Sequence, residues 1–166
     1  MTVVERRFEP LSACYPGWGQ VAAVPWDRPI MGFGVADWHP GDVQIVYRDR
    51  ASFRARLDEW TEANGVELVV GAVPATDHRW MALLPELGFT FFDLTYPVKL
   101  PGLQTATIPD PRVGVRLAQP GDLARLEPIA EQVFRFGRYH ADPLVPVELA
   151  NQRYRVWIKN EFADLS

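Results

Sequence analysis

The sequence predicts a mixed α/β (α+β) protein, with a small N-terminal α/β lobe followed by a region of one strand and two helices. Three observations predict this class. Runs rich in β-branched residues alternate with runs whose apolar residues have helical spacing. A stretch with three prolines and a glycine, at 100–112, follows neither pattern. Of the 166 residues, 48% are hydrophobic, which is enough to bury a core.

The first fifty residues give the weaker signals. The Pro-Gly pair at 16–17 predicts a turn, and residues 30–38 predict a strand with a glycine bulge. The stretch "PWDRPIMGFGVADW", 25–38, contains a basic residue followed by Gly32-Phe33-Gly34, and glycine-rich turns of this kind can hold a phosphate with their N–H groups. The stretch lacks the third glycine that opens a helix in the dinucleotide-binding pattern, so we interpret it as a structural turn that leads into a strand.

The following segments predict two helices, each followed by a strand. The helix over 52–63 has apolar residues at i, i+4 and i+7 and ends at an Asn-Gly pair, and the apolar run 66–74 is a buried strand. The helix over 77–89 has a stripe of tryptophan and leucines, and aromatic and β-branched residues over 89–100 predict a strand. Together these elements form an N-terminal accessory domain, 1–99.

The proline-rich stretch 100–112 reads as a linker to a second domain, 113–166. Alternating valine and leucine predict a strand at the start of this domain, and helical spacing predicts two helices after it. The proline at 128 predicts a bend or a late start in the first of these helices. The three elements are a strand at 113–120 and helices at 122–134 and 147–162.

Charge and composition exclude several function classes. With 17 basic and 21 acidic residues the net charge is −4, which argues against nucleic-acid binding and against adhesion to anionic lipid. No apolar run is long enough to cross a membrane, and the N-terminus lacks the apolar core of a secretion signal. Cys14 is the one cysteine, and we interpret it as a half-buried small residue rather than a reactive thiol. We therefore expect a cytoplasmic protein without nucleic-acid or membrane partners.

Most catalytic and metal-binding motifs are absent from the sequence. It has no nucleophile elbow, P-loop, H-E-x-x-H or paired C-x-x-C, and its three histidines lack metal-ligand spacing, so no metal site is predicted. The most chemically loaded stretch is "FRFGRYHADP", 134–143, where arginine can bind phosphate or carboxylate and tyrosine or histidine can bond a sugar or base. The alternative is a surface loop whose charges only solvate a turn. Its polar residues are Arg135, Arg138, Tyr139, His140 and Asp142.

Two segments of the second domain resemble a known family. "VGVRLAQPGDLARLEPIAEQVF" is similar to the opening strand and first helix of the GNAT N-acetyltransferase fold, and "FRFGRYHADPLVPVELANQRYRVWIKN" to the next loop and helix. The pattern resembles the sugar-nucleotide branch of that superfamily, the dTDP-fucosamine acetyltransferase type. The residues that carry it are Phe134, Arg138, Asp142, Pro143, Arg153, Tyr154, Trp157, Ile158 and Asn160.

The N-terminal domain shares two shorter patterns with this branch. One is Trp26-Asp27 followed by Met31-Gly32-Phe33, and the other is a helix that ends in an L-x-x-L-G-F pattern, here Leu84, Leu87, Gly88 and Phe89. By this resemblance, residues 25–38 open the accessory domain and do not hold the cofactor. The family's pyrophosphate loop has the form R/Q-x-x-G-x-G/A, whereas Arg28 lies four residues before Gly32.

The resemblance implies the N-terminal portion of an N-acyltransferase that moves an acetyl group from acetyl-CoA to an amine, with an amino-sugar nucleotide as the candidate acceptor. The implied substrate contacts are Arg138, Tyr139, His140 and Asp142, and Arg135 and Arg153 are weaker candidates. The family's acetyl-CoA motif and its general acid belong after residue 162. We therefore assign no cofactor-binding or general acid–base residue, and expect a truncated GNAT-like fold that is inactive alone.

Two other interpretations stay open. The chain can be a non-catalytic binding or assembly module, in which Tyr154 and Trp157 of the last helix dock onto a partner chain or onto a second copy. It can also be a small ligand-binding α/β protein with a pocket lined by aromatic residues.

Overall fold

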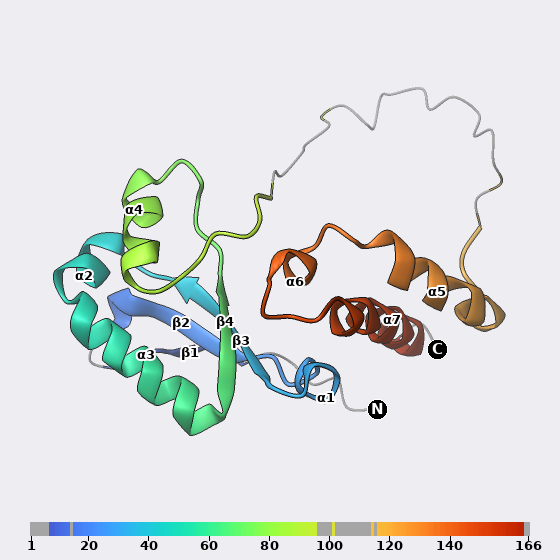
Figure 1. Ribbon diagram of the computed structural model, residues 1–166, viewed down its shortest axis with the longest axis horizontal. Helices are drawn as coiled ribbons and strands as arrows, with labels where there is room; N and C mark the ends of the chain where they lie inside the picture. The colour runs from blue at the N-terminus through green and yellow to red at the C-terminus, as the bar shows by residue number, and fades with distance from the viewer. Residues whose placement is uncertain (1–6, 14, 96–100, 102–113, 115, 165–166) are drawn as a thin grey trace. The chain divides into compact units, whose positions relative to one another are not determined.

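The computed structural model describes residues 7–13, 15–95, 101, 114 and 116–164 (Figure 1). It divides into two compact units, Met1–Phe92 and Asp93–Ser166. Cys14 and all of the predicted linker 100–112 except Pro101 lie outside the described residues, so those interpretations stay predictions. Within the described residues, no helix is long and apolar enough to cross a lipid bilayer.

The fold class is mixed α/β (α+β), as the sequence predicts. The first unit contains a four-stranded sheet in the order β1-β2-β3-β4. The first two pairs are antiparallel, whereas β3 and β4 run parallel. A parallel pair needs a long crossover connection, and two helices occupy the chain between β3 and β4. The strands are β1 (Glu9–Pro10), β2 (Gly19–Ala23), β3 (Gly34–Pro40) and β4 (Val66–Gly71).

The glycine-containing stretch 25–38 forms a short helix and the start of β3. Helix α1 (Arg28–Met31) ends at Gly32, whose φ of 79° is in the left-handed region that favours glycine. The register of β3 against β4 shifts between Gly34 and Val35, as the predicted glycine bulge requires. The predicted strand over 30–38 is therefore shorter than expected, because its first residues belong to α1.

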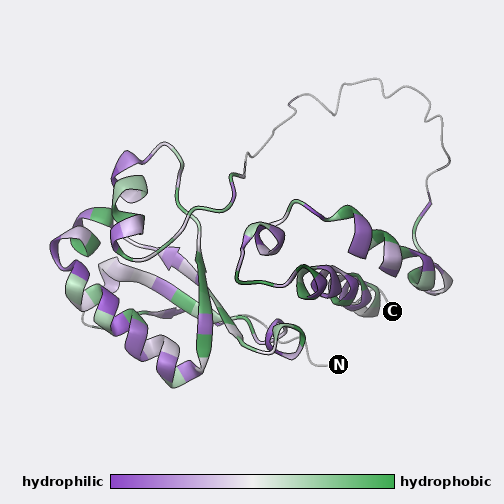
Figure 2. Cartoon of the chain, viewed as in Figure 1, coloured by the Kyte–Doolittle hydropathy of each residue, from purple (hydrophilic) through white to green (hydrophobic). Residues whose placement is uncertain are grey.

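Three helices and the sheet enclose the core of the first unit (Figure 1). Helices α3 (Arg50–Asn64) and α4 (His78–Glu86) and strand β4 confirm the predicted elements at 52–63, 77–89 and 66–74. Helix α3 alternates hydrophilic and hydrophobic residues (Figure 2), and it buries Phe53, Leu57 and Trp60. The 3-10 turn η1 (Pro16–Trp18) occupies the predicted turn, and α2 (Val43–Arg48) was not predicted.

The predicted strand over 89–100 is wrong in its described part, because residues 89–95 form no strand. The first aromatic residue of this segment packs against the core instead of pairing in a strand. The Phe89 ring stacks on Trp38, with 5.2 Å between ring centroids, and Phe89 lies against the core. Phe91 is exposed. Aromatic composition predicts a strand only where a neighbouring strand is free to pair with it.

The second unit is helical in its described part, which confirms the two predicted helices. The proline at 128 lies inside α5 without delaying its start. Among the described residues, the predicted strand at 113–120 is wrong: residue 114 and residues 116–119 form no strand, and Leu117 is 91% exposed. Arg116 bonds Asp122 instead, at 2.6 and 2.7 Å. The elements are η2 (Pro120–Asp122), α5 (Leu123–Val133), α6 (Arg138–Ala141) and α7 (Val147–Asp164).

Helices α5 and α7 pack against each other. Buried alanines, Ala130 on α5 and Ala150 on α7, let helices approach closely. Ion pairs also join the two helices, because Arg155 lies 3.5 Å from both Glu127 and Glu131. Because the Arg155 side chain is half-exposed, these ion pairs add little to stability. Their main effect is to set which faces of α5 and α7 meet.

Candidate functional site

The four predicted substrate-binding residues lie on and just after α6. Arg138, Tyr139 and His140 belong to this short helix, and Asp142 follows its last residue. The sequence predicted a loop here, and the structure places a helical turn in it. Tyr139 is 2% exposed and Asp142 is 5% exposed, so two of the four side chains face inward.

Two arginines lie over the ring of Tyr139. The guanidinium carbon of Arg138 is 4.8 Å from the ring centroid, and that of Arg153 on α7 is 4.4 Å from it. Arg138 also donates a hydrogen bond from Nη2 to the Tyr139 hydroxyl, at 2.9 Å. Guanidinium groups are attracted to an aromatic face, so one buried ring concentrates two positive charges in one place. Arg153, one of the two weaker sequence candidates, thus belongs to this cluster.

His140 presents an unpartnered nitrogen. Its Nε2 lies 2.9 Å from Oδ1 of Asn151, and its ring stacks against Tyr154 at 5.7 Å. Because the Asn151 oxygen can only accept, Nε2 is the donor of this bond, and in the neutral form of the ring Nδ1 would hold the lone pair. Nδ1 is buried and has no hydrogen-bond partner among the described residues. A buried ring nitrogen without a hydrogen-bond partner is uncommon, which makes Nδ1 of His140 the candidate polar atom of this cluster.

The remaining two candidates are occupied locally. The Asp142 carboxylate accepts a hydrogen bond from the backbone N–H of Leu144, at 2.9 Å, and so shapes the turn between α6 and α7. Arg135 donates from Nε to the Gln132 carbonyl at 2.7 Å and closes the end of α5. The structure therefore brings Arg138, Tyr139, His140 and Arg153 together as the α6 cluster.

The glycine turn of the first unit does not fit a coenzyme pyrophosphate. Arg28 donates from Nη2 to the carbonyl of Asn64, at 3.1 Å, and to that of Gly65, so it binds the C-terminal end of α3. A Cβ placed on Gly34 would collide with the Gly65 carbonyl oxygen. Gly34 is needed because two backbones meet here, and the basic residue of the stretch is bound to one of them. No residue of this turn is therefore assigned to acetyl-CoA.

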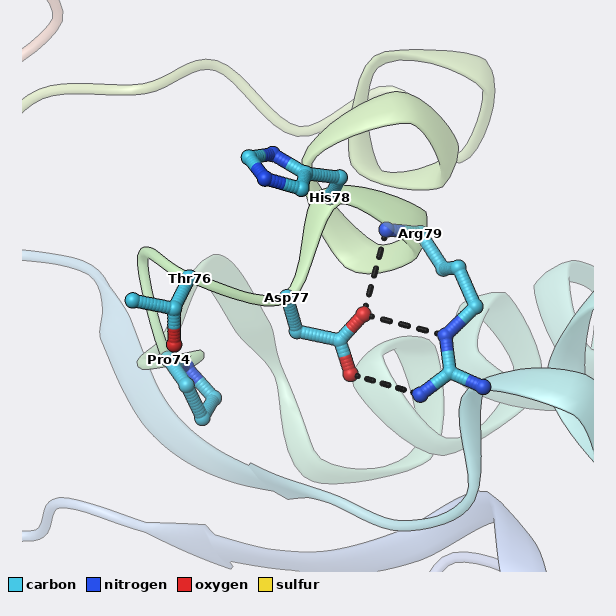
Figure 3. Close-up of a pocket in the computed structure, with 5 residues that line it drawn as sticks. All are labelled: Pro74, Thr76, Asp77, His78 and Arg79. Atoms are coloured by element: carbon cyan, nitrogen blue, oxygen red, sulfur yellow. Dashed lines mark hydrogen bonds and ion pairs between the residues drawn. The ribbon is translucent and has the colours of Figure 1, made fainter.

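A hollow of about 480 Å³ lies at the N-terminus of α4 (Figure 3). Asp77 accepts hydrogen bonds from the backbone N–H of Arg79 at 3.1 Å and from its side chain at 3.1 and 3.2 Å. The Arg79 side chain is the main cause that lowers the pKa of Asp77, and Asp77 raises the pKa of Arg79 in return. These two groups satisfy each other.

A second hollow, of about 510 Å³, is a groove between α2 and α4. Sequence reasoning missed this groove because it did not predict α2. The signal was present in the residues 42–47, where Asp42 can cap a helix and valines recur at i and i+3. Its lining residues are Val43, Gln44, Tyr47, Arg48, Arg79, Ala82, Leu83 and Glu86.

Among the residues that the structure describes, no group of three or more histidine, cysteine or acidic side chains is placed to hold a metal ion. The chain matches no model of a known protein family, no curated protein and no solved structure. The acyltransferase interpretation therefore depends on the two segments quoted above and on the chemistry of the α6 cluster.

Proposed function

We propose that this chain binds the acceptor of a GNAT-type N-acyltransferase, which moves an acetyl group from acetyl-CoA to an amine. The candidate acceptor is an amino-sugar nucleotide. The observation that carries the proposal is the α6 cluster, where Arg138 and Arg153 lie over one buried tyrosine ring. The glycine turn near Arg28 does not fit a pyrophosphate. In this proposal, acetyl-CoA is therefore bound by polypeptide other than this turn and the α6 cluster.

The chemistry of the α6 cluster suits an acceptor that carries both an amine and negatively charged phosphates. A nucleotide sugar carries a diphosphate, and guanidinium groups bind phosphate oxygens through paired hydrogen bonds. An amine must lose a proton before it attacks a thioester carbonyl, and the lone pair on Nδ1 of His140 can accept a hydrogen bond from it. In this proposal the arginines hold the phosphates and His140 orients the amine, so the chain contributes mainly by positioning the acceptor.

Titration calorimetry with the full chain tests this proposal. The ligand is a thymidine diphosphate-linked 4-amino-4,6-dideoxyhexose, and thymidine diphosphate is measured beside it. We expect saturable binding of both, and Arg153→Gln is expected to weaken each by about tenfold or more. Arg125→Gln removes an exposed arginine of α5 that is not part of the cluster, and it should leave binding unchanged.

Two results would contradict the proposal. One is an absence of nucleotide binding by the folded chain, and the other is an Arg153→Gln variant that binds as the original chain does. The same calorimetry is run with acetyl-CoA alone. Tight binding of acetyl-CoA would contradict the assignment of the acyl donor to other polypeptide.

Exposed apolar side chains of the second unit favour a second candidate, the assembly module completed by another chain. Phe136 is 92% exposed, and further apolar residues on α5 and α7 are exposed too. Sedimentation velocity tests this candidate, with an association that grows with concentration as the expected result and a strict monomer as the contrary one. Those further residues are Ile129, Val133, Val147 and Trp157.

A further inference from the structure

The groove between α2 and α4 is built from one stripe of each helix. Its α2 residues are at i, i+1, i+4 and i+5, and its α4 residues are at i, i+3, i+4 and i+7. Residues with these spacings share one face of a helix, so each stripe is continuous. The two helices are in contact in the first unit, where Figure 1 shows them as neighbours.

The floor of this groove is apolar. Val43 and Leu83 lie at the floor, where they are 6% and 2% exposed and belong to the core of the first unit. Tyr47 forms a wall and is 54% exposed, and the exposed Ala82 leaves space because of its small side chain. A floor made of core residues is held in place by the rest of the unit, so the groove is formed before any ligand arrives.

Among the residues that the structure describes, the rim of the groove has one positive charge without a counter-charge. Glu86 lies 3.4 Å from Arg50, and Arg79 is bonded to Asp77. Arg48 is exposed, lines the groove and pairs with none of the described residues. A carboxylate at this rim would therefore meet a guanidinium that is able to bind both of its oxygens.

The size of the groove favours a small molecule. The α4 stripe spans eight residues, 79–86, which is about 10 Å of helix and too short to seat a partner helix of several turns. A volume of about 510 Å³ is in the range of pockets that hold small ligands. We propose that this groove binds a small amphiphilic anion, with its apolar body on Val43 and Leu83 and its carboxylate on Arg48.

Binding of octanoate to the full chain, followed by NMR, tests this inference. We expect saturable shifts at α2 and α4, with octan-1-ol and octylamine binding at least about tenfold more weakly, because neither supplies a carboxylate to Arg48. Arg48→Gln should remove the preference of the site for octanoate over octan-1-ol. Ala82→Trp should abolish the binding of all three, because the indole fills the groove.

Several controls make this result decisive. Arg125→Gln on α5 should change nothing, and circular dichroism checks that each variant is folded. Equal binding of octanoate and octan-1-ol, shifts confined to other elements, or unchanged selectivity in Arg48→Gln would each overturn the inference. Nucleotide binding measured on the same variants reports on the α6 cluster, so failure here is distinguishable from failure of the proposed function.

Discussion

At the scale of single residues, two side chains that the sequence suggests as ligand contacts bind backbone groups in the structure. Arg28 precedes two glycines, a pattern that can bind phosphate, yet its guanidinium donates hydrogen bonds to carbonyls at the end of α3. Asp142 is a predicted substrate contact in a polar loop, yet its carboxylate accepts a hydrogen bond from the backbone N–H of Leu144. In both cases the nearest unsatisfied backbone groups attract the charged side chain before any ligand does.

Gly34 gives the first prediction at this scale. Gly34→Ala should lower the free energy of unfolding by about 1–3 kcal/mol, because the new Cβ collides with the Gly65 carbonyl and β3 must move from β4. Urea unfolding followed by tryptophan fluorescence measures the change.

The control for Gly34→Ala is Gly121→Ala in the second unit, whose unfolding is followed by circular dichroism. A Cβ on Gly121 has no described atom within 4 Å, so this variant should stay within about 0.5 kcal/mol of the original. If Gly34→Ala lowers the free energy of unfolding no more than Gly121→Ala does, then β3 and β4 tolerate a wider separation.

At the scale of elements, the start of α5 shows how a local ion pair replaces a predicted strand. Asp122 accepts from Arg116 at 2.6 and 2.7 Å and from the backbone N–H of Gln119 at 2.8 Å. The Arg116 guanidinium, and then the Gln119 N–H, hold the pKa of Asp122 far below its ordinary value of 3.8. The carboxylate thereby organises η2 and the first turn of α5.

The sign of this pKa shift gives a pH prediction. A carboxyl group whose pKa is lower in the folded state stabilises the fold fully above the unfolded pKa, and this contribution is lost as the pH falls below about 4. Arg116→Gln should therefore raise the pKa of Asp122 toward its ordinary value and lower the stability of the second unit at neutral pH.

NMR titration of the Asp122 carboxyl carbon measures the shift, and urea unfolding at neutral and acidic pH measures the stability. The stability difference between Arg116→Gln and the original chain should shrink as the pH falls through the acidic range. A difference that stays constant with pH would assign the effect to packing and not to the ion pair. Arg125→Gln on α5 removes one positive charge that is a lesser cause of the same shift, so it should change the pKa of Asp122 less than Arg116→Gln does.

At the scale of the whole molecule, the two units differ in the size of their cores. The core cluster of the first unit has 14 buried hydrophobic residues, including four aromatic rings in contact: Trp18, Trp38, Phe53 and Trp80. In the described part of the second unit, the buried hydrophobic residues are two alanines, Tyr139 and Val145. Burial of apolar surface is the main source of stability, so the second unit should be the weaker one.

This difference predicts two unfolding transitions in urea. Trp157 is one of six tryptophans and belongs to the second unit, so Trp157→Phe leaves fluorescence that reports on the first unit. In that variant we expect fluorescence to change at a higher urea concentration than the first loss of helical circular dichroism. Coincident transitions by both probes would show that the chain unfolds as one cooperative unit.

The sequence by itself determined the elements that a local pattern encodes. Apolar spacing placed α3, α4, α5 and α7, the apolar run placed β4, and the glycine stop at Gly65 set the end of α3. The four candidates at 138–142 also came from sequence, because neighbours in the chain are neighbours in space. Such features depend on contacts within a few residues, which the order of residues fixes directly.

Only the tertiary structure decided what met across longer separations. Whether residues 89–95 and 116–119 became strands depended on a partner strand, and these residues have no strand partner in the described structure. Arg153 lies over Tyr139 because α7 packs against α6. The groove exists because α2 packs against α4. Pairing and packing are cooperative properties of distant segments, and local propensity carries no information on which faces meet.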